Sequence, residues 1–135
     1  MSQTIEMTRP KPGTVSWNQL IATNANAAFY AKLFGWHPAP FVPEGLPPGT
    51  QPFTLFKTDR DMKGGGAGMV QKQNPEAPSQ WIPYVVVDDL EAAVAKAVSL
   101  GGKIRTPIKS IGEMGRIAII HDPEGATVGF HEFPK

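Results

Sequence analysis

Residues 84–104 read YVVVDDLEAAVAKAVSLGGKI and decide the fold, because they combine a strand, a helix and the start of a second strand. The apolar, β-branched run at the front predicts a strand over Tyr84 to Val87. Asp88 offers a carboxylate N-cap, with Glu91 as the reciprocal partner of a capping box. Gly101 supplies the left-handed residue that ends a helix. The helix between them has one apolar stripe: Leu90, Ala93, Val94, Ala97, Val98 and Leu100.

The size and charge of the chain exclude several classes of protein. A chain of 135 residues is long enough for one ordinary core, or for two small units that share one. A formal net charge of +1 and unclustered basic residues argue against a nucleic-acid surface. The chain has no cysteine, so disulfides and thiolate metal sites are impossible. Without an apolar run of membrane-spanning length or a signal-peptide pattern, we expect a cytoplasmic protein without a membrane partner.

The first half of the chain repeats the pattern of the second half. A shift of 65 places Trp17 on Ile82, Leu20 on Val85 and Asn24 on Asp89. A shift of 61 places Gly68 on Gly129 near the end of each half. The economical interpretation is an α+β fold in which two βαβββ modules form a curved mixed sheet around a central cleft. An accidental likeness between two amphipathic helices is the alternative, and it does not explain the matched strand ends.

The predicted boundaries follow the distribution of proline, glycine and polar residues. We expect a flexible tail over residues 1–13, a first module over 14–71, a linker over 72–80 and a second module over 81–135, together one domain. Thr23 or Asn24 can cap the first helix, whose predicted buried stripe is Ala28, Phe29, Leu33 and Phe34. Residues 38–52 hold six prolines and predict a stiff loop with at most a short edge strand. A polar turn is expected at residues 59–63, and a loop at residues 108–115.

Four segments resemble the vicinal-oxygen-chelate superfamily, also called the glyoxalase/bleomycin-resistance/dioxygenase proteins. They are VSWNQL, AAFYAKLFGW, WIPYVVVDDLEAAVAKAVSLGG and GRIAIIHDPEGATVGF. The resemblance covers nearly the whole chain from Val15 to Phe133, and the DP-x-G turn before the last strand is its most specific part. It implies two βαβββ modules around a small-molecule site, and it implies a homodimer.

The resemblance also implies where a metal ion would be held in metal-dependent members. Their four ligand positions fall on Trp17, Gly68, Ile82 and Gly129 in this chain. None of these side chains can coordinate a divalent ion, which requires imidazole nitrogen or carboxylate oxygen. We therefore expect no metal and no other cofactor at this site, and we doubt a glyoxalase I type or metal-dependent dioxygenase reaction.

Strand alternation predicts a largely apolar cleft with a few polar groups, the usual composition of a small-molecule site. Its predicted residues are Trp17, Gln19, Gly68, Ile82, Tyr84, Thr127, Gly129 and His131. Plain core packing is the alternative for Trp17, and a strand-end histidine without a chemical task is the alternative for His131. Glu132 is one residue out of phase and should face the helix or solvent. Arg116 is interpreted as a solvated side chain, with an anionic ligand as the alternative.

Three functions remain open from the sequence. The leading hypothesis is a metal-free protein that binds a small, mostly apolar or aromatic molecule in the cleft. The first alternative is a metal-dependent lyase, isomerase or dioxygenase with displaced ligands, chiefly His131 with Glu113 or Glu132. The second is a module that acts through protein contacts without a ligand. Whether the protein is an enzyme is left open; if it is, a glyoxalase-like lyase or a dioxygenase-type oxidoreductase is expected.

Overall fold

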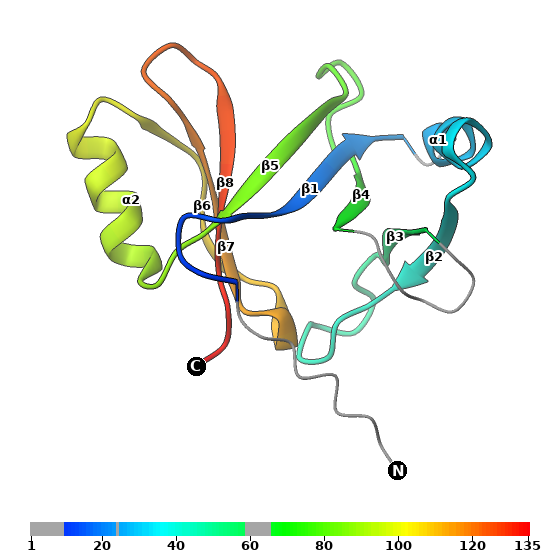
Figure 1. The fold of residues 1–135 in the computed structure, drawn as a ribbon, viewed down its shortest axis with the longest axis horizontal. Coiled ribbons are helices and arrows are strands. Elements are labelled where there is room, and N and C mark those ends of the chain that lie inside the picture. The colour runs from blue at the N-terminus through cyan, green and yellow to red at the C-terminus, as the bar shows by residue number, and fades with distance from the viewer. Residues whose placement is uncertain (1–9, 24, 59–65) are drawn as a thin grey trace.

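The fold is a single eight-stranded mixed sheet with two helices on its outer side (Figure 1). The computed structural model describes residues 10–23, 25–58 and 66–135. The first half contains β1 (Val15–Ala22), α1 (Asn26–Phe34), β2 (His37–Phe41), β3 (Phe53–Lys57) and β4 (Ala67–Gln71). The second half contains β5 (Gln80–Val86), α2 (Leu90–Ser99), β6 (Lys103–Ser110), the 3₁₀ turn η1 (Gly112–Met114), β7 (Arg116–His121) and β8 (Thr127–Glu132).

The order of the strands in the sheet confirms the two predicted βαβββ modules. The strands lie side by side as β2-β3-β4-β1-β5-β8-β7-β6, so each module forms one half of the sheet. β1 and β5 meet in the centre as an antiparallel pair, and within the modules β1 pairs with β4 and β5 with β8 in parallel. The sheet is open, with β2 and β6 as its edges. The predicted fold class is therefore correct.

Side chains of the sheet form separate clusters on its two faces. On the outer face, Leu20 and Phe56 pack with residues of α1, and Leu90 and Ala118 pack at α2. On the opposite face, which we call the inner face, a third cluster forms around Ile82. The alternation of a strand places Trp17, Gln19 and Ile21 on this inner face, while Leu20 and Ala22 face α1. The inner face is the one on which the sequence predicted the site.

The predicted buried stripe of the first helix is wrong. Phe29, Leu33 and Phe34 are 57%, 58% and 57% exposed, and Ala28 is exposed as well. The helix turns Ala27 and Tyr30 to the sheet instead. It starts after Ala25, which gives no side-chain cap, and the amide of Asn26 donates to the carbonyl of Thr23. Asn24, the other predicted cap, lies outside the described residues, as does the predicted turn at 59–63.

The second helix follows its prediction with a shifted N-cap. The cap is Asp89 rather than Asp88: its carboxylate accepts a hydrogen bond of 3.1 Å from the amide of Ala92. Leu90 and Val94 are buried as predicted, but Val98 and Leu100 are 47% and 68% exposed. The stripe is narrower than predicted because the sheet covers only the first two turns of this face.

Two other boundaries differ from the sequence-based prediction. The expected loop at 108–115 is partly strand, since β6 continues to Ser110 and η1 follows it. The proline-rich segment does contain a short edge strand, β2, in which Pro38 and Pro40 pair with β3. Proline has no N–H to present at an open edge, which suits an edge strand. No helix in the described part of the chain is long and apolar enough to cross a membrane.

Candidate ligand-binding site

The pairing of strands repeats the same arrangement in both modules. Gln19 of β1 lies beside Gly68 of β4, and Tyr84 of β5 lies beside Gly129 of β8. These two pairs correspond through the shifts of 65 and 61 residues found in the sequence. At the centre, Trp17 is paired with Tyr84 across the antiparallel β1–β5 ladder. The sheet thus brings together six of the eight predicted site residues: Trp17, Gln19, Gly68, Ile82, Tyr84 and Gly129.

Trp17 extends its indole over the neighbouring strand. A Cβ at Gly68 would lie only 2.7 Å from Cζ2 of Trp17 and 2.8 Å from the carbonyl oxygen of Thr54. Non-bonded carbon atoms prefer about 3.5–4.0 Å, so no larger residue is accommodated at position 68 without movement. The missing side chain of Gly68 therefore gives the indole its place on the inner face.

Tyr84 uses Gly129 in the same way in the second module. Its phenol ring lies over Gly129, where a Cβ would fall 2.6 Å from two ring carbons. Burial raises the pKa of Tyr84 to about 12, and the positive charge of Arg105 opposes this to a smaller extent. The hydroxyl is therefore protonated at neutral pH and can donate a hydrogen bond.

The side chains around these rings are apolar. Ile82, Ile117 and Ile119 are buried and contact one another and Tyr84. Partly buried side chains complete the cluster: Trp17, Ile21 and Ile111. An apolar surface with few polar groups suits an apolar or aromatic molecule better than a strongly hydrated one.

Gln19 is the buried polar side chain at the centre of the sheet. It is 8% exposed, and the indole N–H of Trp17 donates to its Oε1 over 2.7 Å. Its Nε2 is buried and has no hydrogen-bond partner in the described part of the chain. A buried donor without a partner is uncommon, since its desolvation costs about 1–3 kcal/mol.

His131 is held at the lower end of the inner face. It is 7% exposed, its Nε2 lies 2.7 Å from the carbonyl oxygen of Met114, and its ring stacks on Phe133 at 4.2 Å between centroids. A carbonyl oxygen can only accept, so Nε2 carries the proton. Burial lowers the pKa of His131, against the smaller effect of the Met114 bond, so the ring is neutral and its Nδ1 is an acceptor. Thr127, the eighth predicted residue, lies apart, opposite His121 at the start of β8.

Loops from the two modules meet at one end of the sheet. The amide of Glu113 in η1 donates to the carbonyl of Glu44 over 2.8 Å, and Glu113 Oε1 accepts from the amide of Glu44 over 3.1 Å. Glu44 belongs to the proline-rich loop between β2 and β3. This reciprocal contact links the outer strands of both modules. Glu113, which the sequence offered as a possible metal ligand, uses its carboxylate oxygen Oε1 in this contact.

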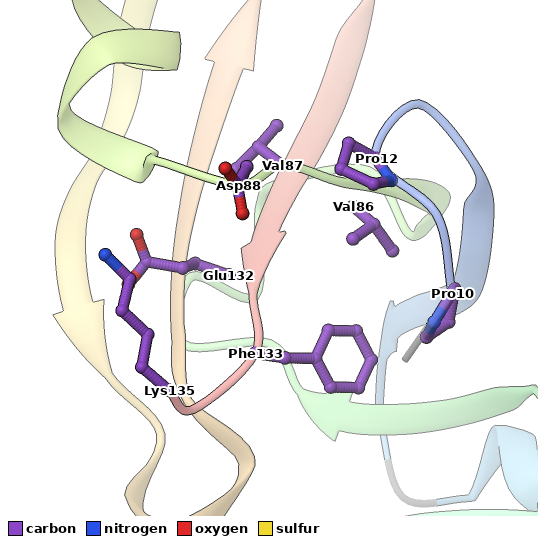
Figure 2. Close-up of a pocket in the computed structure, with 8 residues that line it drawn as sticks. All are labelled: Pro10, Pro12, Val86, Val87, Asp88, Glu132, Phe133 and Lys135. Carbon is purple, nitrogen blue, oxygen red and sulfur yellow. The ribbon is translucent and has the colours of Figure 1, made fainter. Parts of the chain in front are cut away.

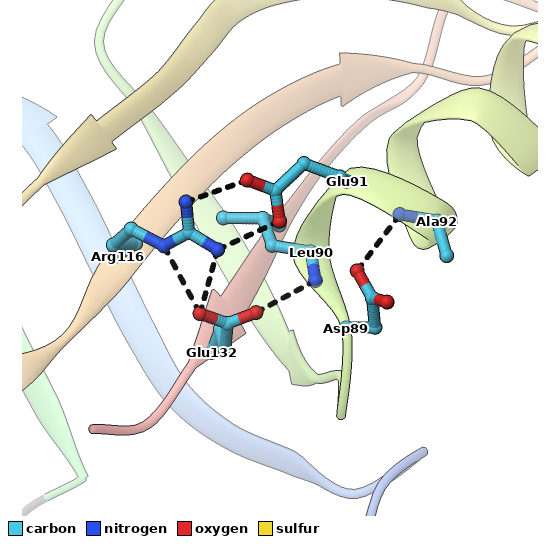
Figure 3. Close-up of polar contacts among 6 residues, drawn as sticks. All are labelled: Asp89, Leu90, Glu91, Ala92, Arg116 and Glu132. Carbon is cyan, nitrogen blue, oxygen red and sulfur yellow. Dashed lines mark hydrogen bonds and ion pairs between the residues drawn. The ribbon is translucent and has the colours of Figure 1, made fainter. Parts of the chain in front are cut away.

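A charged network, which the sequence analysis missed, lies on the outer face at the start of α2 (Figure 3). Arg116 binds Glu91 at 2.7 Å and Glu132 at 2.8 Å, so this partly exposed side chain is paired with carboxylates and is not free for an anionic ligand. Glu132 Oε2 also accepts from the amide of Leu90 over 2.8 Å, which bears out its predicted orientation toward the helix. The signal available in the sequence was the out-of-phase position of Glu132 on a strand whose other face lines the site.

The Arg116 network lowers the pKa values of both carboxyl groups. The hydrogen bond from Arg116 is the main cause that brings the pKa of Glu91 to about 2. The amide of Leu90 is the main cause that lowers the pKa of Glu132, and Arg116 adds to it. Both groups are therefore carboxylates throughout the physiological range.

The residues at the inner face do not suit a divalent metal ion. The four positions implied by the family carry an indole, a branched alkyl group and bare backbone, and the Trp17 and Tyr84 rings fill the space above Gly68 and Gly129. In the described ranges, the one group of three close acidic or imidazole side chains is Asp89, Glu91 and Glu132 on the outer face. Arg116 already pairs with two of these carboxylates, Glu91 and Glu132, and that of Asp89 caps α2. Glu132 and His131 are consecutive in β8 and face opposite ways, so they cannot share an ion.

A separate small hollow opens near the C-terminal end of the chain (Figure 2). Its volume is about 100 Å³. Its lining consists of Pro10, Pro12, Val86, Val87, Asp88, Glu132, Phe133 and Lys135. Sites for drug-sized ligands measure about 300–1,000 Å³, so this hollow is too small for such a molecule.

Curated relatives share about a third of their residues with this chain. CFP32 of Mycobacterium tuberculosis, named as a provisional glyoxylase, is 34% identical over 121 residues, which cover 88% of this chain and 45% of that protein. The anthracycline biosynthesis protein DnrV of Streptomyces peucetius is 33% identical over 136 residues, which cover 90% of this chain and 47% of that protein. The chain thus spans about half the length of the curated relatives it matches.

Solved structures share the fold at low sequence identity. A variant of methylmalonyl-CoA epimerase from Streptomyces coelicolor matches with a TM-score of 0.61 and 14% identity, over 93% of this chain and 100% of that one. Homoprotocatechuate 2,3-dioxygenase from Brevibacterium fuscum matches with a TM-score of 0.56 and 17% identity, over 95% of this chain and 39% of that one. At such identities the likeness concerns the fold alone.

The family model agrees with the fold and with the repeat in the sequence. It matches residues 22–130, which include both helices, the strands from β2 to β7 and most of β8. The chain belongs to the Glyoxalase/Bleomycin resistance protein/Dioxygenase superfamily.

Proposed function

We propose that the protein binds a small, mostly apolar or aromatic molecule on the inner face of its sheet, without a metal ion. The observation that carries this proposal is the placement of the Trp17 and Tyr84 rings over Gly68 and Gly129, beside the buried cluster around Ile82. Flat aromatic surfaces stack favourably on aromatic ligands. In this proposal Gln19, Tyr84 and His131 supply the few polar contacts.

The chemistry of the inner face supports binding without an ion. The superfamily positions for metal ligands carry Trp17, Gly68, Ile82 and Gly129, which offer no imidazole or carboxylate group. His131 is the one titratable imidazole here, and its Nε2 is bonded to the Met114 carbonyl. A metal-dependent lyase, isomerase or dioxygenase would need several ligands that these residues do not supply.

One relative supports the aromatic character of the proposed ligand. DnrV is named for anthracycline biosynthesis, and anthracyclines are flat, polycyclic aromatic compounds. Because this chain covers 47% of that protein, the same ligand class is proposed here only for the inner face.

The test combines intrinsic fluorescence with thermal stability. Trp36 and Trp81 pack with Tyr30 and Phe56 on the outer face, so Trp36→Phe and Trp81→Phe together leave Trp17 as the sole reporter. An aromatic library should contain compounds that change Trp17 emission with saturation and raise the melting temperature. A library in which no compound does either contradicts the proposal. Stoichiometric nickel, zinc, iron or manganese in the purified protein would favour the metal-dependent alternative.

We further propose that two copies of the chain associate through the outer surface of α1. Phe29, Leu33 and Phe34 form a cluster of large apolar side chains there, each 57–58% exposed. A cluster of large, exposed apolar side chains often marks a surface that another protein covers. The curated relatives are about twice as long, and a second copy would supply comparable mass beside this module. The small-molecule site and the dimer surface lie on opposite faces of the sheet.

A further inference from the structure

The amide group of Gln19 has a fixed orientation. The indole N–H of Trp17 is a donor only, and it lies 2.7 Å from the Gln19 side chain. The oxygen of the amide must therefore face Trp17, because the reverse orientation would place two donors against each other. The amide nitrogen is consequently the group that Gln19 presents to its other surroundings.

This amide nitrogen lies in the row of residues that forms the centre of the inner face. Gln19 is paired with Gly68 on one side and with Ile82 on the other. Neither glycine nor isoleucine has a side-chain acceptor that could bond to Nε2. Gln19 Nε2 and the hydroxyl of Ser16 are the two buried side-chain atoms without a partner among the described residues.

We propose that Gln19 Nε2 donates a hydrogen bond to a carbonyl oxygen of the bound molecule, which makes the ligand an aromatic or alicyclic ketone or quinone. This inference rests on the proposed function of the inner face. A carbonyl oxygen accepts without bringing a donor of its own, whereas a hydroxyl would add an unpartnered donor to an apolar surface. A carboxylate would be buried against a single neutral donor, which is unfavourable for a charge.

Tyr84, in the second module, offers a second hydrogen-bond donor to a ligand with carbonyl oxygens. Its hydroxyl stays protonated at neutral pH, because burial raises its pKa to about 12, so it can donate a hydrogen bond. Gln19 lies on β1 and Tyr84 lies on β5, and these two strands pair with each other. The side-chain amide of Gln19 and the hydroxyl of Tyr84 are therefore two neutral donors on adjacent strands. A ligand with two oxygens on a rigid ring system, such as a quinone, can accept from both.

The experiment compares ligands that differ only in the carbonyl group. Suitable pairs are fluorenone with fluorene and 1-tetralone with tetralin, which keep the ring frame and replace C=O by CH₂. Wild-type protein should bind the ketone about tenfold more tightly than the hydrocarbon, the value of one net hydrogen bond. In ¹⁵N-labelled protein, the side-chain NH₂ signals of Gln19 should shift downfield with the ketone and not with the hydrocarbon.

Two variants separate the donor from the Trp17 contact. Gln19→Met keeps an unbranched side chain of similar size but removes the donor, and it should reduce the ketone preference to about onefold. Gln19→Glu, studied at pH 8, keeps an acceptor for Trp17 while it removes the N–H donors, and it should lose the preference as well. A preference that survives in Gln19→Glu but not in Gln19→Met would overturn the inference, since the effect would then come from the position of Trp17.

The failure of this inference can be distinguished from the failure of the proposed function. If ketone and hydrocarbon bind wild-type protein with equal affinity, the carbonyl assignment is wrong while the site itself stands. If the preference persists in both variants, another group is the donor, and the assignment to Gln19 is wrong. If no member of either pair and no library compound binds, the proposed function is wrong, and the inference fails with it.

Discussion

The ring of Tyr84 lies directly over Gly129, its neighbour in the parallel β5–β8 pair. A Cβ at Gly129 would be 2.6 Å from both Cδ2 and Cε2 of the ring. The same relationship holds between Trp17 and Gly68 in the other module, where the closest ring atom would be 2.7 Å away. The two glycines therefore give the aromatic side chains of the inner face the space they occupy.

Gly129→Ala should lower the free energy of unfolding by about 1–3 kcal/mol, the usual cost of overpacking a well-packed site. The added methyl group collides with ring atoms of Tyr84, which is itself only 6% exposed and has little room to move. Urea denaturation measures the change. In a Tyr84→Leu background the same substitution should cost much less, because the colliding ring atoms are absent.

Gly68→Ala is the matched substitution in the first module, and it should not be rescued in the same way. Its Cβ would meet the carbonyl oxygen of Thr54 at 2.8 Å in addition to Trp17. A backbone carbonyl in a paired strand cannot rotate away as a side chain can, so the cost should persist in a Trp17→Leu background. Equal rescue of both glycine variants would contradict this account of the two sites.

Tyr84 should make the protein less stable at alkaline pH. Burial raises its pKa to about 12, above the ordinary value of 10.0, which the unfolded chain adopts. Between these values the unfolded state loses the proton and the folded state keeps it, so stability falls as pH rises. A difference of this size corresponds to a loss on the order of 2 kcal/mol between pH 10 and pH 12.

Tyr84→Phe provides the control for the alkaline prediction. It removes the hydroxyl and keeps the ring over Gly129, so the variant should lose less stability than wild type over this pH range. Phenolate absorbance near 295 nm, followed in folded protein, should show a late-titrating group in wild type that is missing from the variant. A wild-type protein with no tyrosine titrating above pH 11 would show that Tyr84 is less buried than the structure has it.

The architecture could be predicted from the sequence because its signals are local or repeated. The periodicity around Leu90 and Val94 and the shifts that relate the two halves fixed the modules, and the strand pairing of Gln19 with Gly68 and of Tyr84 with Gly129 agrees with them. The first helix was harder, because its apolar side chains are more numerous than the positions the sheet can cover. Phe29 and Leu33 satisfied the pattern of a buried stripe, yet the sheet contacts Ala27 and Tyr30.

The polar details of the site depend on contacts between distant residues, which no local pattern records. The bond from Trp17 to Gln19 could be suspected from their spacing, but the unpartnered Nε2 could not. The ion pairs of Arg116 join residues 25 and 16 positions away. The N-cap is Asp89 rather than Asp88 because β5 ends at Val86 and α2 begins at Leu90. A shift of one residue in these ends would have made Asp88 the cap.

Substitution of the exposed residues of α1 tests the proposed dimer. Size-exclusion chromatography with light scattering should give wild-type protein a mass near 29 kDa, which is twice the 14.6 kDa of one chain. Leu33→Asp and Phe34→Asp should reduce the mass to that of one chain, because each places a charge in the apolar contact. Lys32→Asp changes an exposed residue of the same helix outside this cluster and should leave the dimer intact. A wild-type protein that elutes at 14.6 kDa at all concentrations would refute the self-association.

Arg116→Met should destabilise the protein because it leaves the carboxylate of Glu132 without its cation. The Glu132 side chain is only 9% exposed, whereas that of Glu91 is 63% exposed. A buried charge without a partner is much less favourable than an exposed one. Arg116→Met should therefore lower the melting temperature by several degrees, and Glu91→Gln should change it far less. Thermal denaturation at pH 7 compares the two variants with wild type.

Acid titration tests the Arg116 network by protonating its carboxylates, Glu91 and Glu132. The pKa of Glu132 is lowered in the folded protein and that of Glu91 lies at about 2, below the ordinary value of 4.5. The stability contributed by these groups is present above pH 4.5 and is lost as the pH falls toward 2, because the unfolded state takes up protons first. Glu132→Gln should flatten the stability profile between these values, since its amide does not titrate. If Glu132→Gln and wild type lose stability in parallel below pH 4.5, Glu132 does not hold its charge in the folded protein as the contacts with Leu90 and Arg116 require.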